Sequence, residues 1–428
     1  MTDTLGGRPR TAKLRSEARR RDVWAQPVAR QFLLSQGAGQ AADAVTALVL
    51  ARVLLSDGSS GIEPALLLQT IAVAAVPYAV VGPISGVIAD HWNRRRALVV
   101  ANAARAAVTT VAMVAVQLGD RTLGLVAAAS LLSLARLVYT LRAASLSRAV
   151  PTRLLVAADS AALLVGAVAG GIGAALGSAG ALHRPSLLLG VAALAQVAAA
   201  GGFLLLPCDL GGHSMKRSVP LGVVARRVVC LLTSSPTRFA IAVTSGHRAL
   251  LGALFATFVI LVSNDYGFGA SGYVAAIVVT GTGSFVGTLT APSWIGRFGL
   301  RGTVFVAFVV PAVVLPVGAA VGTRLVVAGS LTLAFFLFQN LRVLADAIVQ
   351  SNIADDARAR VFSIYDAAYN LTYFGGAAAA IALDTSEHGR PAIAVVGGCY
   401  AVTVVALVAS RRPSLVTATT TARIGVAT

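Results

Sequence analysis

Hydrophobic residues form long stretches along the chain, and short polar segments separate them. A helix that spans a bilayer needs about 20 mainly apolar residues. Twelve stretches reach this length, with boundaries set to within several residues: 29–55, 64–89, 97–117, 122–144, 154–180, 185–206, 239–262, 270–294, 301–321, 324–347, 360–383 and 391–410. The pattern therefore predicts an all-α membrane protein with 12 transmembrane helices.

The longest internal polar segment predicts two groups of six helices. Within it, residues 219–232 mix apolar side chains with arginines, as in a helix that lies on a membrane surface. We expect five parts in two pseudo-symmetric halves: a basic cytosolic tail (1–28), an N-terminal six-helix half (29–206), a cytosolic linker (207–238), a C-terminal six-helix half (239–410) and a second cytosolic tail (411–428).

Basic residues gather on one side of the predicted membrane. With the N-terminus inside the cell, the cytosolic segments carry 25 of the 35 Lys and Arg residues, whereas the outer loops carry only Arg121, Arg184, Arg324 and Arg390. This bias is typical of cytosolic loops. The net charge of +18 therefore indicates topology and contact with anionic lipid headgroups rather than nucleic acid binding. We expect a multi-pass protein of the plasma (inner) membrane with both termini in the cytosol.

Composition supports the membrane assignment and narrows the chemistry. Hydrophobic residues make up 57% of the chain and charged residues 12%, whereas soluble domains carry about 25% charged residues. The three cysteines, Cys208, Cys230 and Cys399, form no disulfide or zinc pattern. The chain also has no nucleotide-binding loop and no catalytic triad. We therefore expect no metal, no cofactor, no enzymatic activity and no ATP-driven transport within this chain.

A charged motif ends the second span. In "GVIADHWNRRRAL", an acid and a run of arginines follow more than twenty uncharged residues, at Gly86, Asp90, Arg94 and Arg95. A degenerate echo, "GTLTAPSWIGRFGLRG", follows the eighth span, with Gly287, Arg297, Gly299 and Arg301. By itself the motif is also consistent with a simple helix stop anchored by positive charges.

Motif and echo together resemble the major facilitator superfamily, whose loop signature is Gly-x-x-x-Asp-x-x-x-Arg-(Arg/Lys). Asn93 replaces the glycine usual in the middle. The resemblance implies transport by alternating access. It also implies a conformational latch, in which Asp90 contacts a helix N-terminus of the second half and closes the cytosolic side. Gly86 would permit close helix approach, and the arginines would anchor the loop at lipid headgroups.

Two further fragments resemble the drug-antiporter branch of that superfamily. In "RLVYTLRAA" the residues Arg136, Ala143 and Ala144 match its fourth-helix pattern, and in "GAVAGG" the residues Gly166, Gly170 and Gly171 match its fifth-helix pattern. The usual proline is Ala167 here, and the glycines also fit simple helix packing. The segment "IADDARARVFSIYDAAYN" resembles cytosolic loops of macrolide-efflux and siderophore-export carriers.

The resemblance, which covers residues 29–410, implies a monomeric, proton-coupled exporter of a small amphipathic compound, drug-like or a siderophore. The alternatives are a metabolite importer or facilitator, a lipid flippase, and a non-transporting membrane adaptor. An adaptor has no need of an acid in the middle of a span.

Charged residues inside the spans are the candidates for function, because charges in the bilayer normally face a partner or a wet cavity. Asp43 can carry a coupled proton, form a structural pair with Arg105 or Arg136, or contact substrate. The proton-coupling candidates are Asp43, Arg136 and His247, and the substrate candidates are Arg105, Arg248, Arg342, Asp346, Tyr369 and Tyr373.

Spacing gives three further expectations for the second half. Arg342 and Asp346 are four residues apart and are expected to form an ion pair, with substrate binding as the alternative. Asp366 is expected to cap a helix or to pair with a loop arginine. Tyr365, Tyr369 and Tyr373 share one helix face, where they can line an aromatic cavity or pack against another helix.

Overall fold

The computed structural model describes the greater part of the chain. The described residues are 20–55, 62–77, 81, 84–85, 88, 92–151, 154–180, 184–206, 210, 235–269, 271–351, 358–383 and 389–409. All regular elements within these ranges are helices, which confirms the all-α prediction.

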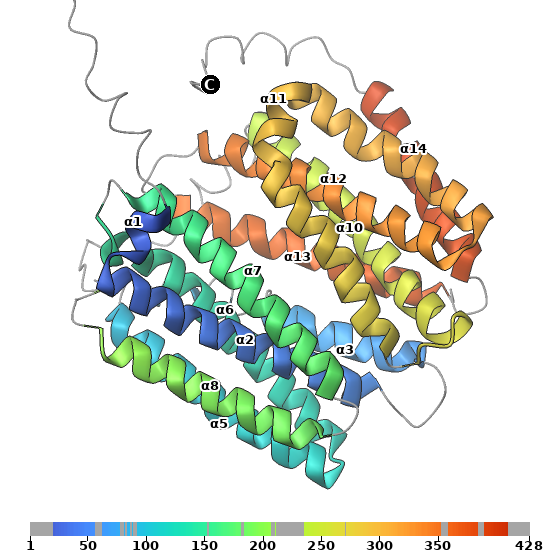
Figure 1. The fold of residues 1–428 in the computed structure, drawn as a ribbon. Coiled ribbons are helices and arrows are strands. Elements are labelled where there is room, and N and C mark those ends of the chain that lie inside the picture. The colour runs from blue at the N-terminus through green and yellow to red at the C-terminus, as the bar shows by residue number, and fades with distance from the viewer. Residues whose placement is uncertain are drawn as a thin grey trace, which may run out of the picture. The chain divides into compact units, whose positions relative to one another are not determined.

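Long helices coincide with the predicted spans (Figure 1). The short α1 (Arg20–Trp24) lies in the predicted tail. The first predicted half contains α2 (Pro27–Leu55), α3 (Pro64–Val76), α5 (Arg94–Leu118), α6 (Arg121–Ala149), α7 (Leu155–Gly180) and α8 (Pro185–Leu204). The second predicted half contains α10 (Ser235–Ile260), the short η3 (Leu261–Asp265), α11 (Ser271–Val321), α12 (Arg324–Ser351), α13 (Arg358–Ala382) and α14 (Gly389–Ala409).

Nine of the described helices are long and apolar enough to cross a membrane. One of them, α11, has 51 residues and would extend about 77 Å if straight, far beyond the roughly 30 Å of a hydrocarbon core. It breaks at Gly299, where φ is 65° and ψ is −176°, a conformation open essentially to glycine alone. The two parts match the predicted eighth and ninth spans. The full count of twelve stays a prediction, because α3 and α13 do not meet the same criterion.

Contacts divide the described helices into two units. The first holds the helices from α1 to α10, together with η3, α13 and the start of α11 up to Val278; the second holds the rest of α11, α12 up to Leu344, and α14. In the first unit α2 packs against α7 and α8, α5 packs against α6 and α8, and α13 packs against α10 and α3 (Figure 1). The predicted division into six-helix halves at 207–238 stays a prediction.

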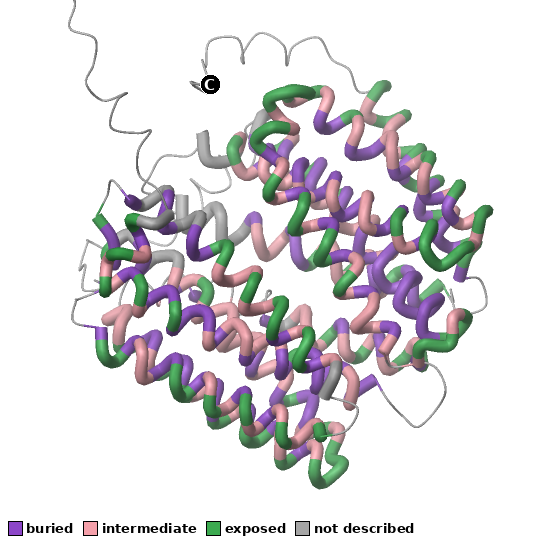
Figure 2. Tube along the Cα trace, viewed as in Figure 1, coloured by how far each residue is buried: buried purple, intermediate pink, exposed green. Residues whose placement is uncertain are grey.

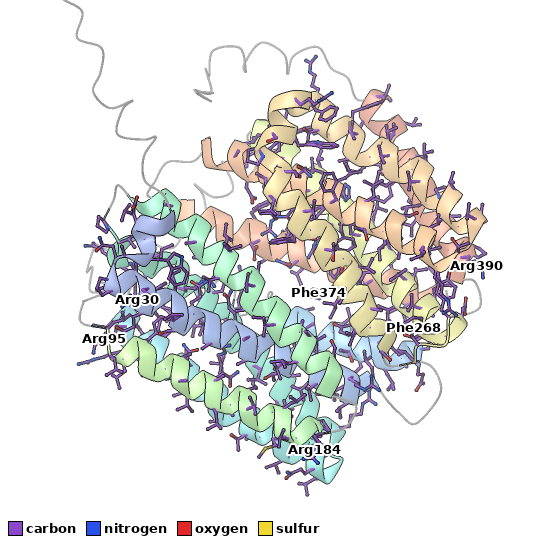
Figure 3. The ribbon with its side chains drawn as sticks, viewed as in Figure 1. Arg30, Arg95, Arg184, Phe268, Phe374 and Arg390 are labelled. Atoms are coloured by element: carbon purple, nitrogen blue, oxygen red, sulfur yellow. The ribbon has the colours of Figure 1, made fainter. Side chains whose placement is uncertain are left out.

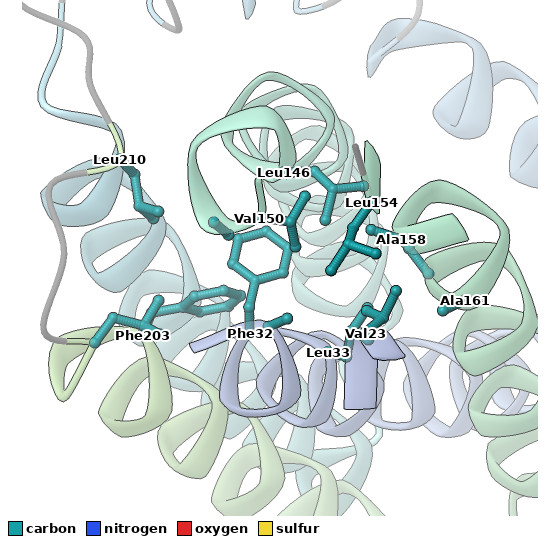
Figure 4. Close-up of a cluster of buried hydrophobic side chains, with 14 of the residues drawn as sticks. Val23, Phe32, Leu33, Leu146, Val150, Leu154, Ala158, Ala161, Phe203 and Leu210 are labelled. Atoms are coloured by element: carbon teal, nitrogen blue, oxygen red, sulfur yellow. The ribbon is translucent and has the colours of Figure 1, made fainter. Parts of the chain in front are cut away.

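Aromatic and branched side chains form the core between α1, α2, α7 and α8. Phe32 of α2 and Phe203 of α8 meet edge to face, with ring centroids 5.5 Å apart. Leu33, Leu154 and Ala158 are buried in the same cluster (Figure 4). This packing fixes α2, which carries Asp43, against its neighbours.

The outward face of α8 is apolar, as expected of a helix in contact with lipid. Leu187, Val191, Leu194 and Val197 recur at helical spacing and are all more than half exposed. The opposite face carries the buried residues Leu189, Ala192 and Gln196. Figure 2 shows this alternation of buried and exposed positions along the long helices. A water-soluble protein would place polar residues on the outward face.

Glycines let α7 approach α2, but two of the three predicted packing glycines do not take part. A methyl group added at Gly166 would lie 2.8 Å from the amide oxygen of Gln40. The same addition at Gly170 or Gly171 would contact nothing among the described residues. The close approach occurs instead at Gly173 and Gly177, next to α2. These two form the small-xxx-small pattern that lets helix backbones meet, and this spacing is visible in the sequence.

We therefore expect Gly173→Ala to destabilise the protein and Gly171→Ala to leave it as stable as the parent. The new methyl group at Gly173 would overlap the backbone carbonyl of Ala41, so α2 and α7 must separate, at a cost of about 1–3 kcal/mol. At Gly171 the methyl group has room, and alanine favours helix by about 0.5–1 kcal/mol. Thermal unfolding of each purified variant in detergent, compared with the parent, measures the change in stability. Equal melting temperatures for the two variants would contradict this account of the packing.

Candidate functional site

An ion pair joins Asp43 in the middle of α2 to Arg105 of α5. The side chain of Arg105 is 1% exposed and that of Asp43 is 34% exposed. Arg105 also donates from Nη1 to Asn102 Oδ1 at 2.8 Å and from Nη2 to the carbonyl of Gly39 at 3.0 Å. Of the two partners expected for Asp43, the structure thus selects Arg105, which a carboxylate and two neutral acceptors hold in a buried position.

A second ion pair joins Arg136 of α6 to Asp366 of α13. The amide of Asn370 donates to the same carboxylate oxygen at 3.2 Å. Both charged side chains keep some access, with 17% of Arg136 and 18% of Asp366 exposed. This partner of Asp366 is an arginine inside a span, 230 residues away in sequence. The expected helix cap or loop-arginine contact of Asp366 stays a prediction.

Arg248 of α10 lies across the rings of two tyrosines of α13. The centre of its guanidinium group is 4.7 Å from the ring centroid of Tyr369 and 4.2 Å from that of Tyr373. A cation over an aromatic face is attracted by the ring's negative face. Tyr369 and Tyr373 stand three and seven residues after Asp366, so all three side chains share one face of α13.

Two glycines bring α10 and α13 into backbone contact and so position Arg248. A methyl group at Gly252 of α10 would overlap the carbonyl of Tyr373, and a methyl group at Gly376 of α13 would overlap the carbonyl of Ala249. Arg248 stands one turn before Gly252, at the height where its guanidinium group reaches the tyrosines. The sequence by itself predicts no role for these two glycines.

The tyrosine face of α13 packs largely against α10. Tyr365 and Tyr369 are buried, and the hydroxyl of Tyr365 donates to Thr244 Oγ1 at 3.3 Å. The Tyr373 ring lies 6.1 Å from Phe255, centroid to centroid. This face was expected either to line an aromatic cavity or to pack against another helix. Tyr365 and Tyr369 pack against α10, whereas Tyr373 is only half-buried.

The remaining intramembrane candidates lie on α10 and α12. His247 is fully buried in α10. Arg342 and Asp346 of α12 are both half-buried, and their mutual ion pair stays a prediction. In the described part of the chain, no group of three His, Cys, Asp or Glu residues could hold a metal ion.

Comparison with known proteins gives two relatives by sequence and a set of solved structures with the same fold. No family model matches the chain. Two proteins called uncharacterised MFS-type transporters, from Mycobacterium bovis and Mycobacterium tuberculosis, are each 28% identical to it over 412 residues, which cover 88% of this chain and 90% of each relative. Over most of its length the chain is therefore similar to proteins named as MFS-type transporters, the superfamily whose loop signature its motif resembles.

Solved structures with the same fold are those of other transporters. A variant of the nucleoside transporter NupG has a TM-score of 0.69 at 11% identity and covers 90% of this chain and 100% of that chain. A variant of the peptide transporter POT has a TM-score of 0.67 at 12% identity, covering 92% and 98%. The Escherichia coli fucose:proton symporter FucP has a TM-score of 0.55 at 15% identity, covering 88% and 97%. The chain therefore has the fold of these membrane transporters.

Part of the superfamily motif falls within the described residues. Gly86 and Asp90 lie outside them, so the latch stays a prediction. Arg94 and Arg95 begin α5, and Asn93, at the position of the usual glycine, caps that helix by accepting a hydrogen bond from the backbone N–H of Arg96 at 3.0 Å. Arg95 donates to the carbonyl of Leu204 at the end of α8. Arg94 and Arg95, which were expected in a loop, thus lie in a helix, and Arg95 connects α5 to α8.

The echo after the eighth span is described in full. Gly287 lies against α12, because an added methyl group would be 2.7 Å from the carbonyl of Phe336. Gly299 forms the break in α11, and Arg297 and Arg301 on either side of it are exposed. These residues therefore shape a helix junction with charged flanks. Their relation to the first-half motif stays a prediction.

Proposed function

We propose that this transporter moves a small amphipathic compound coupled to protons, with Asp366 as the coupling carboxylate. The observation that carries the proposal is the Arg136–Asp366 ion pair. A carboxylate inside a span can take and release a proton. Because both side chains remain partly exposed, a proton can reach the pair.

The place of this pair connects protonation to movement. Arg136 belongs to a helix of the first predicted half and Asp366 to a helix of the second. In alternating access, contacts between the halves must break on one side of the membrane while others form on the opposite side. A proton on Asp366 removes the charge that holds Arg136, and the two helices can then separate. Asp366 stands about 12 Å from the start of α13, toward the predicted cytosolic side.

Asp43 and His247, the other proton-coupling candidates, fit this role less well. Asp43 and Arg105 both belong to the first predicted half, so alternating access need not separate them. We assign that pair to the structure of the half. His247 is fully buried, whereas the Arg136–Asp366 pair keeps access to protons.

An outer contact supports the same movement. The side-chain oxygen of Asn264, in η3, accepts a hydrogen bond from the backbone N–H of Ile62 at 2.8 Å, and its amide donates to the carbonyl of Ile62 at 3.4 Å. Ile62 precedes α3, and Asn264 follows α10, so the contact again joins the two predicted halves. It lies on the predicted outer side, and we propose that it must open there.

A cross-link between residues 62 and 264 should therefore stop transport. In a protein with Cys208, Cys230 and Cys399 replaced by serine, Ile62→Cys and Asn264→Cys joined by a short bifunctional thiol reagent should reduce transport at least about tenfold, because the outer side cannot open. Cleavage of a reducible linker should restore it. The single Ile62→Cys variant treated with the same reagent is the control. Full transport by the cross-linked protein would refute the proposal that the contact between Ile62 and Asn264 must open.

For orientation, we propose that both termini lie in the cytosol of a cell whose plasma (inner) membrane holds the protein as a monomer. Arg30 and Arg95, both expected on the cytosolic side, lie near one end of the N-terminal helices, and Arg184, expected outside, lies near the other (Figure 3). Cytosolic arginines then contact anionic lipid headgroups.

Export and uptake are the two candidate directions. The match of Arg136, Gly166, Gly170 and Gly171 to the drug-antiporter patterns favours export. The stacking of Arg248 on Tyr369 and Tyr373, close to Asp366 on the same helix face, favours uptake of an anion together with a proton.

Compound accumulation in cells with and without the gene identifies the transported compound and its direction. Proteoliposomes with an imposed pH gradient then test the coupling. We expect the gradient to drive that compound uphill, and transport that is indifferent to the gradient would overturn the proposed function.

A further inference from the structure

Positive charge exceeds negative charge within the spans. The predicted spans contain six arginines that the topology leaves inside the membrane and four aspartates: Arg52, Arg105, Arg136, Arg142, Arg248 and Arg342, with Asp43, Asp159, Asp346 and Asp366. Charge in the bilayer core is costly and is normally balanced by a partner or a wet cavity. A transporter with this balance is better matched to a negatively charged substrate than to a positively charged one.

Arg248 is the arginine best placed to receive such a substrate. The central carbon of its guanidinium group lies 4.7 Å from the ring centroid of Tyr369 and 4.2 Å from that of Tyr373, so the two aromatic rings hold the charged group in place. The N–H donors of a guanidinium group point outward in its plane, in the fork that matches a carboxylate. Beside it, Tyr373 continues into an aromatic cluster, with Phe255 6.1 Å away and Tyr273 5.8 Å from Phe255, centroid to centroid.

We infer that Arg248 and Tyr373, with the buried Tyr369 holding Arg248 in place, form the binding site of an amphipathic organic anion with one carboxylate and one aromatic group. The inference rests on the proposed function, because it names the substrate class of the proton-coupled transport. The carboxylate pairs with the Arg248 fork, and the aromatic group packs against Tyr373 and Phe255. The backbone contact of Gly252 and Gly376 fixes α10 against α13, so the site is held by two helices.

The proton on Asp366 and the anion at Arg248 assist each other. Tyr369 and Tyr373 follow Asp366 by one to two helical turns, so the anion binds close to the coupling carboxylate. The charged and titratable side chains around Asp366 come from α6, α10 and α13, whereas α3, which also packs on α13, has none: Arg136, Tyr139, Arg142, His247, Arg248, Tyr365, Tyr369 and Tyr373. An anion disfavours the charged carboxylate and thereby favours its protonation, and by reciprocity the proton tightens binding of the anion.

This linkage fixes the charge moved in each cycle. One bound proton and one bound monovalent anion leave the charge of the carrier as it was when empty. Empty and fully loaded carriers therefore reorient with the same charge, and transport is electroneutral. Proton and anion travel in the same direction, which corresponds to uptake in a cell that maintains a more acidic exterior.

Binding of matched compounds tests the site. Purified protein is titrated with a panel of aromatic carboxylic acids, each paired with its primary amide, and with benzyltrimethylammonium as a cation; hippurate and its amide are the first pair. Thermal stabilisation reports binding, because a ligand of the folded state raises the melting temperature. We expect acids to bind and to lose about 10- to 100-fold in affinity in Arg248→Gln, as for a lost charge-assisted hydrogen bond. Arg248→Lys keeps the charge but lacks the fork, so its affinity for the acids should lie between those of the parent and Arg248→Gln.

Arg52→Gln serves as the matched control, because Arg52 is also an arginine inside a span but stands in the last turn of α2. It should bind the acids as the parent does. The inference is overturned if no acid binds better than its amide, if the cation binds better than the acids, or if Arg248→Gln and Arg52→Gln bind equally well.

Transport of the bound acid in proteoliposomes tests the charge balance. A pH gradient should drive uptake at least tenfold above background, whereas a potassium diffusion potential of either sign should leave the rate unchanged. A strong response to the potential would refute the electroneutral cycle. If acids bind at Arg248 but Asp366→Asn is still driven by the pH gradient, the proposed coupling fails and the anion site stands. If Asp366→Asn is no longer driven by the pH gradient but acid binding does not depend on Arg248, the anion site fails and the proposed coupling stands.

Discussion

Replacing Asp366 with asparagine is expected to abolish proton-driven accumulation and to leave substrate exchange intact. Asparagine has the shape of the protonated acid and cannot release a proton. The carrier then behaves as if permanently protonated at this position, so it binds and exchanges substrate but no longer draws energy from the pH gradient. Net uphill transport should fall at least about 100-fold, the lower range for loss of a positioned proton-transfer group.

Proteoliposomes separate the two activities. Counterflow of labelled against unlabelled compound should stay within about twofold of the parent, and accumulation under a pH gradient should fall to background. The variant should also accumulate normally in membranes, because the Arg136–Asp366 pair is partly exposed rather than sealed in the core. A stable Asp366→Asn protein that still concentrates substrate at the parental rate would remove Asp366 from the mechanism and direct attention to His247.

Asp43→Asn is expected to act on folding instead. Arg105 is 1% exposed, and removal of its only carboxylate among the described contacts leaves a buried charge with two neutral acceptors. Breaking a buried pair in this way costs about 3–5 kcal/mol, a large part of the stability of a typical domain. We expect the variant to accumulate poorly and to unfold at a lower temperature.

The double variant Asp43→Asn with Arg105→Gln distinguishes a structural pair from a proton site. Since it removes the stranded charge, it should recover most of the lost protein and still respond to a pH gradient. The contrary outcome is a stable Asp43→Asn protein that exchanges substrate but is indifferent to the pH gradient. It would make Asp43 the coupling residue, the first of the three alternatives that the sequence left open.

Sequence predicted the spans well because the bilayer imposes a simple length requirement. About 20 apolar residues are needed to cross it, so the stretches that became α2, α5, α6, α7 and α8 could be located from composition alone. The basic residues predict which end of each helix faces the cytosol for a similarly local reason, because each short loop carries its own share of arginines. The predicted start of the third span was less accurate. The side chain of Asn93 caps α5 and decides where the helix begins, but asparagine is equally common in loops, so the sequence does not mark this start.

Which acid meets which arginine was decided only by tertiary structure. From sequence alone, Asp43 has two possible partners by depth and the partner of Asp366 inside a span is not foreseen, because depth along a helix says nothing about which neighbour the helix packs against. The partner of Asp366 is 230 residues away, and that contact depends on how α6 and α13 pack. Gly173 likewise shows its role only next to Ala41. Local apolar length thus determined the membrane helices of this chain, whereas the meeting of distant helix faces decided which buried charges are paired.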